Sequence, residues 1–221
     1  MSYQDDHRTT AAEPETISVS SVDSMRVVLL RMPTVIQWAY GDLSFLQQPP
    51  ETMTSKMART AFLKKEEDAW GQSVMKQVRP DLHLNQQWTN VFGEILTMEA
   101  YTLLGETAFK PKRKNKLLPD CETENRVIES KTQTYYTRGT AGEKILGAPF
   151  KYASVPDVYG KPLDIVCIGG AERVCKTQYG NLAGPVQDAK KQEYLQFLSE
   201  NRIRFVAFTD LLERIHCAEY V

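Results

Sequence analysis

Apolar residues recur at helical spacing in two long segments of the first half of the chain. Thr54 or Ser55 can cap the first helix, which continues until Pro80 stops it, with one buried face and a charged face formed by KKEED, residues 64–68. The second helix is predicted over about residues 85–104, and the glycine that follows is placed as its C-cap. The apolar segment upstream of these helices has no spacing of apolar residues that would assign it to a helix or to a strand.

The second half of the chain alternates between strand and helix patterns. Apolar–polar alternation predicts a hairpin whose two strands are joined across the polar segment ETEN. A helix from about Ala141 to Ser154, which Thr140 can cap, comes next. The two strands of the hairpin are LLPDCE (117–122) and RVIESKTQTYY (126–136). The remaining predicted elements are the strand PLDIVCIGG (162–170), a helix over 186–201 and the strand IRFVAFTDLL (203–212).

The order of these elements predicts the fold class. A strand, a helix and another strand form a right-handed crossover, which pairs the two strands in parallel. Together with the antiparallel hairpin, this predicts an α/β protein with a mixed central sheet flanked by helices on both faces. Residues 1–24 are polar and acidic and are expected to form a mobile arm. Residues 25–221 are expected to form one domain, with a helical extension over about 25–84 and a core over about 85–210.

Composition narrows the classes of protein. A chain of 221 residues with 42% hydrophobic and 25% charged residues can bury a substantial core. No stretch approaches the roughly 18 consecutive apolar residues of a membrane-spanning helix, and the N-terminus lacks a signal-peptide pattern, so we expect a soluble, intracellular protein without a membrane partner. Four cysteines without a CxxC pair and only three histidines offer little material for a zinc site.

The formal net charge is only −1, but the charges are unevenly distributed. Residues 1–24 hold five acidic side chains and one arginine, whereas residues 110–151 hold ten Lys or Arg and five Asp or Glu. Within this basic region, KPKRKNK (110–116) places five cations in seven positions, a pattern that attracts phosphate backbones. The alternative is a solvated basic loop without a ligand.

Three chemical groups are predicted to meet on the hairpin. Side chains alternate between the two faces of a strand, so Glu129 and Lys131 lie side by side on one face. Asp120 arrives from the neighbouring strand, after Pro119, which is expected to keep it off the hydrogen-bond ladder. Two carboxylates at one site repel each other unless a divalent cation lies between them, and Mg²⁺ prefers such oxygen ligands. The alternative is an ordinary exposed ion pair between Glu129 and Lys131.

A fourth acidic residue lies within the apolar stripe of the second helix. Glu94 follows Gly93, whose missing side chain would let another segment approach closely. Glu94 is therefore either a further residue of the site or a partly exposed glutamate in a salt bridge.

Pro119-Asp120, followed after eight residues by Glu129-Ser130-Lys131, resembles the signature of the PD-(D/E)XK nuclease superfamily, and more narrowly that of type II restriction endonucleases. The helix that carries Gly93-Glu94 resembles the first core helix of such enzymes. TRGTAGEKILGAPFKYASVP, residues 137–156, resembles the segment that follows their catalytic strand. The resemblance covers about residues 85–170 and implies a restriction-endonuclease-like core.

The resemblance also implies an activity, a cofactor and partners. The expected reaction is hydrolysis of phosphodiester bonds at specific sites in double-stranded DNA, dependent on Mg²⁺ or a substituting Mn²⁺, with 5′-phosphate and 3′-hydroxyl ends. The expected metal ligands are Asp120, Glu129 and the backbone carbonyl of Ser130. Glu94 would bind a second metal, and Lys131 would position or help to deprotonate the attacking water. A homodimer would match two-fold symmetric DNA, and a cognate DNA methyltransferase is a candidate partner. The expected location is the cytoplasm of a bacterium, or of a host infected by a phage or large DNA virus.

Basic residues around the hairpin are candidates for DNA contact, and the turn-rich segment 175–185 is a candidate recognition loop. The candidate cations are Lys112, Arg113, Lys114, Arg138 and Lys144. Three alternatives remain open: a nuclease of DNA repair or recombination that resolves junctions or acts as an exonuclease, a catalytically silent DNA-binding module, and an unrelated α/β protein.

Overall fold

The computed structural model describes residues 29–82, 88–137 and 141–218. The predicted arm over residues 1–24, the start of the second predicted helix near residue 85 and the predicted cap Thr140 lie outside these ranges.

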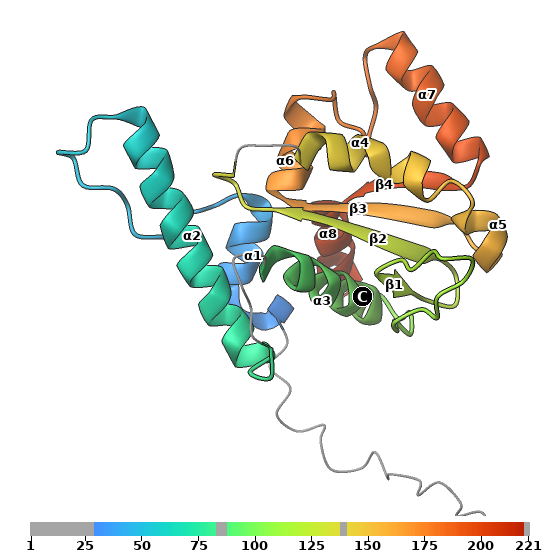
Figure 1. Cartoon of the computed structure of the whole chain (residues 1–221), viewed down its shortest axis with the longest axis horizontal. Coiled ribbons are helices and arrows are strands. Elements are labelled where there is room, and N and C mark those ends of the chain that lie inside the picture. Colours follow the sequence, from blue (N-terminus) through green and yellow to red (C-terminus); the bar gives the residue numbers. More distant parts are fainter. Residues whose placement is uncertain (1–28, 83–87, 138–140, 219–221) are drawn as a thin grey trace, which may run out of the picture.

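A mixed sheet of four strands forms the centre of the fold (Figure 1). Its order is β1-β2-β3-β4; β1 is antiparallel to β2, whereas β2, β3 and β4 are parallel. The strands are β1 (Cys121–Glu122), β2 (Val127–Gln133), β3 (Leu163–Gly169) and β4 (Ile203–Ala207). This confirms an α/β protein with a mixed sheet, and it confirms the hairpin. β1 is short, but pairing continues beyond it, because Phe109 and Glu122 exchange two backbone hydrogen bonds of 2.9 Å.

The described part of the first half is helical. Its elements are a 3-10 helix, η1 (Leu29–Arg31), and the helices α1 (Pro33–Tyr40), α2 (Lys56–Val78) and α3 (Trp88–Leu103). α2 begins after Ser55, whose hydroxyl accepts a hydrogen bond of 3.4 Å from the amide of Ala58. Both predicted helices are thus confirmed. α1 fills the run that the pattern left unassigned, with Pro33 as its first residue, where a missing N–H costs little.

Five helices form in residues 141–218. They are α4 (Ala141–Lys151), α5 (Val155–Tyr159), α6 (Gly170–Thr177), α7 (Ala189–Glu200) and α8 (Phe208–Ala218). None of the helices within residues 29–82, 88–137 and 141–218 is both long and apolar enough to cross a membrane.

The strand predicted over residues 203–212 is wrong in its second half. β4 ends at Ala207, and α8 begins at the next residue. Glu172 of α6 explains this start, because its carboxylate accepts hydrogen bonds of 3.1 Å from the amide and 2.6 Å from the hydroxyl of Thr209, in the first turn of α8. Such an acceptor satisfies amides that a helix start leaves without a partner. α6 itself was not predicted from the pattern.

Other helix boundaries also differ from the predictions. The helix expected to end at Ser154 ends at Lys151, and a separate short helix follows. The helix expected over residues 186–201 begins only after Asp188, whose side chain caps it by accepting from two backbone amides. The expected recognition loop over 175–185 begins inside α6, so only its later residues lie outside the helix.

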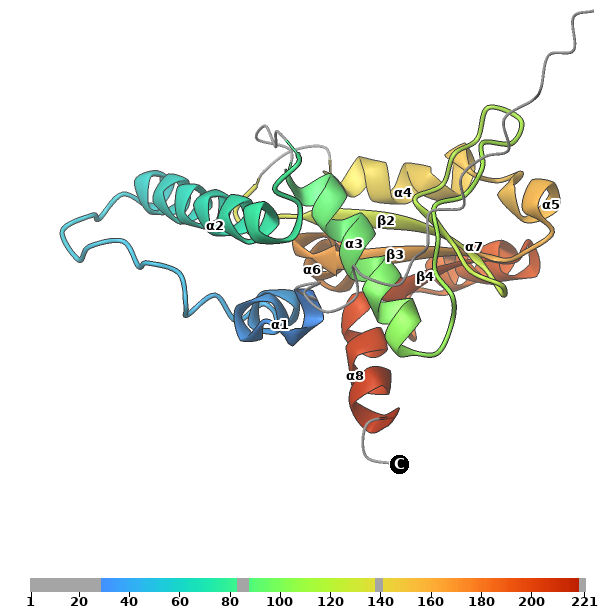
Figure 2. The ribbon, with the colours of Figure 1, turned by 90° about the horizontal axis from the view of Figure 1, so that it is seen from below.

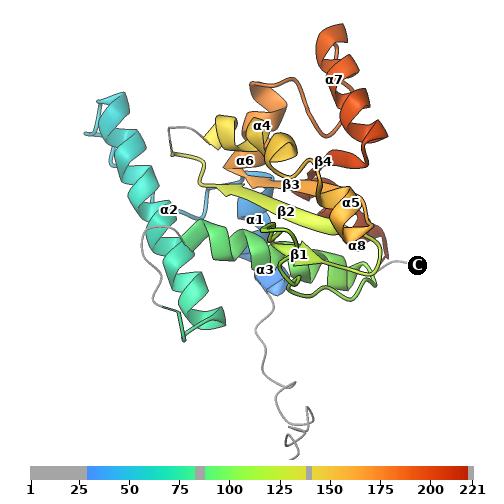
Figure 3. The ribbon, with the colours of Figure 1, turned by 45° about the vertical axis from the view of Figure 1, so that its right-hand side comes forward.

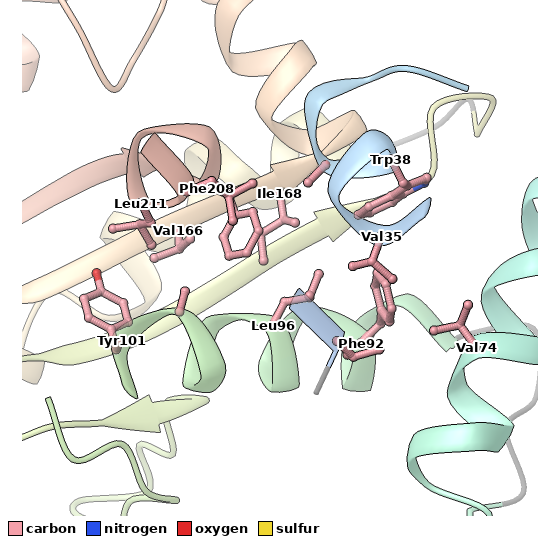
Figure 4. Packing of buried hydrophobic residues seen from close by; sticks show 14 of the residues in the cluster. Val35, Trp38, Val74, Phe92, Leu96, Tyr101, Val166, Ile168, Phe208 and Leu211 are labelled. Carbon is pink, nitrogen blue, oxygen red and sulfur yellow. The ribbon is translucent and has the colours of Figure 1, made fainter. Parts of the chain in front are cut away.

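The two faces of the sheet carry separate apolar cores. On one face, Val166 and Ile168 of β3 pack with side chains from α1, α3 and α8 (Figure 4). On the other face, Ile165 and Cys167 pack with side chains from α4, α6 and α7. Figure 1 shows α4 and α6 above the strands, and Figure 2, seen from below, shows α3 crossing in front of them. Helices therefore flank both faces, which explains why every residue of β3 is buried.

α2 extends to one side of the sheet in Figure 1 and is anchored by a buried glutamate. Glu67 is fully buried; it accepts a hydrogen bond of 2.7 Å from the indole N–H of Trp38 and two, of 2.9 and 3.0 Å, from the amide of Tyr135 just after β2. Burial raises the pKa of Glu67, although these hydrogen bonds oppose the shift. The KKEED segment is therefore not a purely charged outer face, because one of its carboxylates joins α2 to α1 and to the sheet.

Candidate active site

The hairpin brings together the three residues of the predicted motif. Glu129 and Lys131 lie on the same face of β2, with 2.5 Å between Lys131 Nζ and Glu129 Oε1. Asp120 directly precedes β1, and its Oδ2 accepts a hydrogen bond of 2.8 Å from the amide of Ser130. In Figure 3 β1 lies beside β2 and close to α3. The Glu129–Lys131 pair is not an ordinary exposed ion pair, since Glu129 is 3% exposed.

The register of the hairpin sets Asp120 opposite Glu129. Cys121 is the partner of Ile128 in the antiparallel pair, so the preceding residue faces Glu129 across the strands. As expected for the residue after Pro119, Asp120 lies outside β1 and outside its paired residues, although its amide still donates a hydrogen bond of 3.1 Å to the carbonyl of Ile128.

The two carboxylates of the hairpin influence each other. Burial first, and then the negative charge of Glu129, raise the pKa of Asp120 to about 7, while the amide of Ser130 and the charge of Lys131 act in the opposite direction. Glu129 has one oxygen, Oε2, that is buried without a hydrogen-bond partner in the described structure. A buried, unpaired carboxylate oxygen is costly. The site is therefore suited to a positive ligand.

The raised pKa of Asp120 predicts a pH dependence of stability in the absence of metal. The folded protein holds this proton more tightly than the unfolded chain, so the stabilisation is fully present below about pH 4 and is lost as the pH rises through about 7. We expect the stability advantage of the unchanged chain over Asp120→Asn to shrink over this interval. Urea unfolding in EDTA at several pH values measures that difference. A difference that does not vary with pH would show that neither burial nor the charge of Glu129 raises the pKa of Asp120 in solution.

Glu94 lies near Asp120, but it already has a partner. It contributes to the raised pKa of Asp120, and its Oε2 forms an ion pair with Lys110. The glycine before it is required for packing, because any Cβ on Gly93 would overlap the hydroxyl of Thr132 on β2. The close approach predicted from Gly93 is thus made by β2. Glu94 is the partly exposed, salt-bridged glutamate of the alternative interpretation, and its role at a second metal stays a prediction.

The donors that could hold a cation are oxygen atoms. Within the described residues, no three side chains of His, Cys, Asp or Glu converge as a metal site. The predicted ligand set needs only two such side chains, Asp120 and Glu129, together with the carbonyl of Ser130, from which Lys131 Nζ lies 3.5 Å. The unpaired Oε2 of Glu129 is an observation that fits a hard divalent cation such as Mg²⁺.

The basic segment 110–116 contains a tight turn. Backbone hydrogen bonds of 3.0 and 2.8 Å join Lys114 and Leu117, and the two residues between them, Asn115 and Lys116, have φ angles of 47° and 66°. Two successive positive φ angles are the geometry of a two-residue hairpin turn, in which asparagine is favoured. The segment is therefore a small hairpin rather than an irregular loop.

Cations of this hairpin and of α4 are available to a ligand. Lys112 and Arg113 are exposed, and so is Lys114, whose ammonium lies 4.4 Å from the centre of the Tyr159 ring. Lys144 is exposed on α4. The fifth candidate, Arg138, lies outside the described residues. The basic hairpin adjoins the acidic site, because Lys110 at its start pairs with Glu94.

The sequence reasoning missed two residues at the site. Lys110 was counted only as part of a basic run, and nothing in the sequence indicates that it pairs with Glu94. Tyr152 directly follows α4 and is buried, and burial first, then the charge of Glu129, raise the pKa of its hydroxyl. Helical spacing places Tyr152 with Ile145 on one face, but it does not reveal which strand residue they meet.

Comparisons with models of protein families, with characterised proteins and with solved structures found no match for this chain.

Proposed function

We propose that this chain is a Mg²⁺-dependent endonuclease of the PD-(D/E)XK type that cleaves double-stranded DNA at specific sites, most like a type II restriction enzyme. The observation that carries the proposal is the convergence of Asp120, Glu129 and Lys131 on one hairpin, with a buried carboxylate oxygen left unpaired. The element order adds support, since α3 precedes the hairpin and α4 connects the parallel pair β2 and β3. A restriction-endonuclease-like core remains part of the proposal.

The residues have distinct tasks in this proposal. Asp120, Glu129 and the carbonyl of Ser130 would hold the cation, and Mn²⁺ could replace Mg²⁺. The bound cation would supply Lewis-acid stabilisation of charge on the scissile phosphate and the leaving oxygen. Lys131, as an ammonium, can donate hydrogen bonds to a phosphate oxygen and to the attacking water, but it has no lone pair with which to take a proton. We therefore assign positioning of the water to Lys131 and release of the proton to solvent.

The basic hairpin would bind the DNA backbone. Lys112, Arg113 and Lys114 are exposed beside the site, and Lys144 projects from α4. Each phosphate contact of this kind releases counterions, so binding should weaken steeply with salt. Arg138 stays a candidate on sequence grounds alone. Symmetric recognition sites would call for a homodimer, and a methyltransferase that modifies the same site would protect the cell in which the nuclease acts.

The test is incubation of the purified protein with unmethylated duplex DNA in Mg²⁺ and in EDTA, beside Asp120→Asn. Discrete fragments that require Mg²⁺ and are absent with Asp120→Asn would support the proposal, and sequencing their ends would give the site and the position of the phosphate. Asp157→Asn is a matched control, because Asp157 is exposed and pairs with Arg202. Cleavage only at branches or free ends would favour a repair or recombination nuclease. No cleavage by the unchanged chain on any substrate would overturn the proposal.

A further inference from the structure

α3 and β2 contact each other through a glycine and side chains that carry hydroxyls. Gly93 lies against Thr132, because a Cβ on Gly93 would overlap the Thr132 hydroxyl. One helical turn further along α3, Thr97 lies against Ser130, with 2.9 Å between their hydroxyl oxygens. Four residues of a helix and two residues of a strand span nearly the same length, about 6 Å and about 6.6 Å. The two contacts therefore fix one register of α3 on β2.

The hydrogen bond between the two hydroxyls has a defined direction. The hydroxyl of Thr97 donates to the carbonyl of Gly93 at 2.8 Å. A hydroxyl has one proton, so Thr97 has none left for Ser130. The hydroxyl of Ser130 is therefore the donor, and the hydroxyl oxygen of Thr97 is the acceptor. Because Thr97 is fully buried, water does not compete for this acceptor.

The backbone of Ser130 belongs to the candidate site, although its side chain points to α3, on the face opposite to Glu129 and Lys131. Its amide donates to Asp120 Oδ2 at 2.8 Å, and Lys131 Nζ lies 3.5 Å from its carbonyl oxygen. The amide and the carbonyl of one strand residue point toward the same neighbouring strand, so both face the side on which Asp120 lies. Ser130 is thus held on α3 by its side chain, and it holds Asp120 by its amide.

We propose that Thr97 is a positioning residue of the site: by accepting the hydroxyl of Ser130, it fixes the strand residue whose amide orients Asp120 and whose carbonyl is the predicted third ligand of the divalent cation. This proposal rests on the proposed function, because it assigns a role at the same site. Thr97 acts through Ser130 and not by contact with the cation or the DNA. Hydrogen bonds behind the ligands of a metal commonly set the metal affinity in this way.

A purely structural role makes a different prediction. Thr97→Val keeps the shape of the side chain but removes the acceptor, so the hydroxyl of Ser130 loses its fixed partner. If Thr97 only packs α3 on β2, this variant will unfold at a lower urea concentration but bind Mn²⁺ as tightly as the unchanged chain. If Thr97 positions Ser130, Mn²⁺ binding will weaken about 10-fold, the lower end of the range for partners of metal ligands. Thr97→Ser, which keeps the hydroxyl, should bind Mn²⁺ like the unchanged chain.

The experiment is calorimetric titration of the full chain with Mn²⁺ for Thr97→Val, Ser130→Ala and the double variant, together with the Mg²⁺ concentration that half-saturates cleavage. Two variants that break the same hydrogen bond are not additive, so the double variant should bind metal no more weakly than the weaker single variant. Thr102→Val is the matched control, because the hydroxyl of Thr102 makes the same kind of bond within α3, 2.8 Å to the carbonyl of Met98, on an exposed side chain. This control should leave metal binding unchanged.

The outcomes separate the two proposals. Weaker metal binding by Thr97→Val and Ser130→Ala that is not additive in the double variant, with Thr102→Val unchanged, supports the role of Thr97. Equal binding by the unchanged chain and by Thr97→Val, or losses that add in the double variant, overturn that role and leave the nuclease proposal standing. If Thr97→Val does not fold, weaker binding by Ser130→Ala supports the role and unchanged binding overturns it. Failure of the unchanged chain both to bind Mn²⁺ and to cleave DNA overturns the two proposals together.

Discussion

Replacing Lys131 by methionine is expected to lower the rate of Mg²⁺-dependent DNA cleavage by about 10²–10⁴-fold. The ammonium lies 2.5 Å from Glu129 Oε1 and on the same face as the predicted metal ligands, so it can reach the water and the phosphate. Methionine keeps most of the apolar stem but has no hydrogen-bond donor. Single-turnover cleavage at saturating DNA and Mg²⁺ measures the effect on the chemical step and excludes an effect of weaker binding.

Lys161→Met is the matched control for this loss. Lys161 also pairs with a glutamate of the hairpin, at 2.7 Å from Glu122 Oε1, and it donates to the carbonyl of Thr123. Its removal deletes the same kind of ion pair outside the motif, so the cleavage rate should stay close to that of the unchanged chain. Equal losses for the two variants would show that the hairpin needs its ion pairs for stability and that Lys131 has no special role. Lys131→Arg should also be slow, because a planar guanidinium does not replace a compact ammonium.

Local sequence patterns predicted much of the architecture. The apolar spacing over residues 54–79 and the cap at Ser55 located α2, and alternation located the hairpin and the shared face of Glu129 and Lys131. These features depend on residues that are close in sequence, where periodicity and capping act directly. The buried strand β3 was also predicted, because its long apolar run can only be covered on both faces.

Features that depend on distant partners were not predicted. α8 was taken for the continuation of a strand, because its start is fixed by Glu172, which lies on another helix. Glu67 was assigned to a charged face, although Trp38 and Tyr135 make it a buried acceptor. A single sequence gives residue types but not the pairing of segments that are far apart along the chain.

The candidate site shows the same division: the residues that are close in sequence were predicted, and those from distant segments were not. The motif itself comes from one hairpin and was found, since its three residues are joined by strand alternation and register. Lys110 pairs with Glu94 from the basic segment, and Tyr152, whose pKa the charge of Glu129 helps to raise, directly follows α4. Their contribution depends on how α4 and the basic hairpin pack, which no local pattern specifies.

Asp164→Ala is expected to destabilise the fold by about 3–5 kcal/mol. Asp164 lies on β3 with no exposed surface, and its carboxylate accepts hydrogen bonds of 2.7 and 3.0 Å from Arg204 and of 2.9 Å from each of Arg126 and Tyr101. Alanine would remove the acceptor of the buried Tyr101 hydroxyl and one of the two carboxylates that hold Arg126, whose side chain is only 18% exposed. Urea unfolding at pH 7 measures the free energy, and an exposed pair provides the control: Asp157→Ala, which frees Arg202, should cost at most about 1 kcal/mol.

The pH dependence gives a second test of the Asp164 cluster. Burial alone would raise the pKa of Asp164, but hydrogen bonds and charge from Arg204, and then from Arg126, outweigh it and lower the pKa. The stabilisation is therefore present above the ordinary value of 3.8 and is lost as the pH falls through the lower, folded value. The stability difference between the unchanged chain and Asp164→Asn should then be constant near neutrality and shrink only in acid. A difference that shrinks already between pH 5 and 7 would mean that the arginines do not hold the carboxylate charged, and that burial controls this cluster.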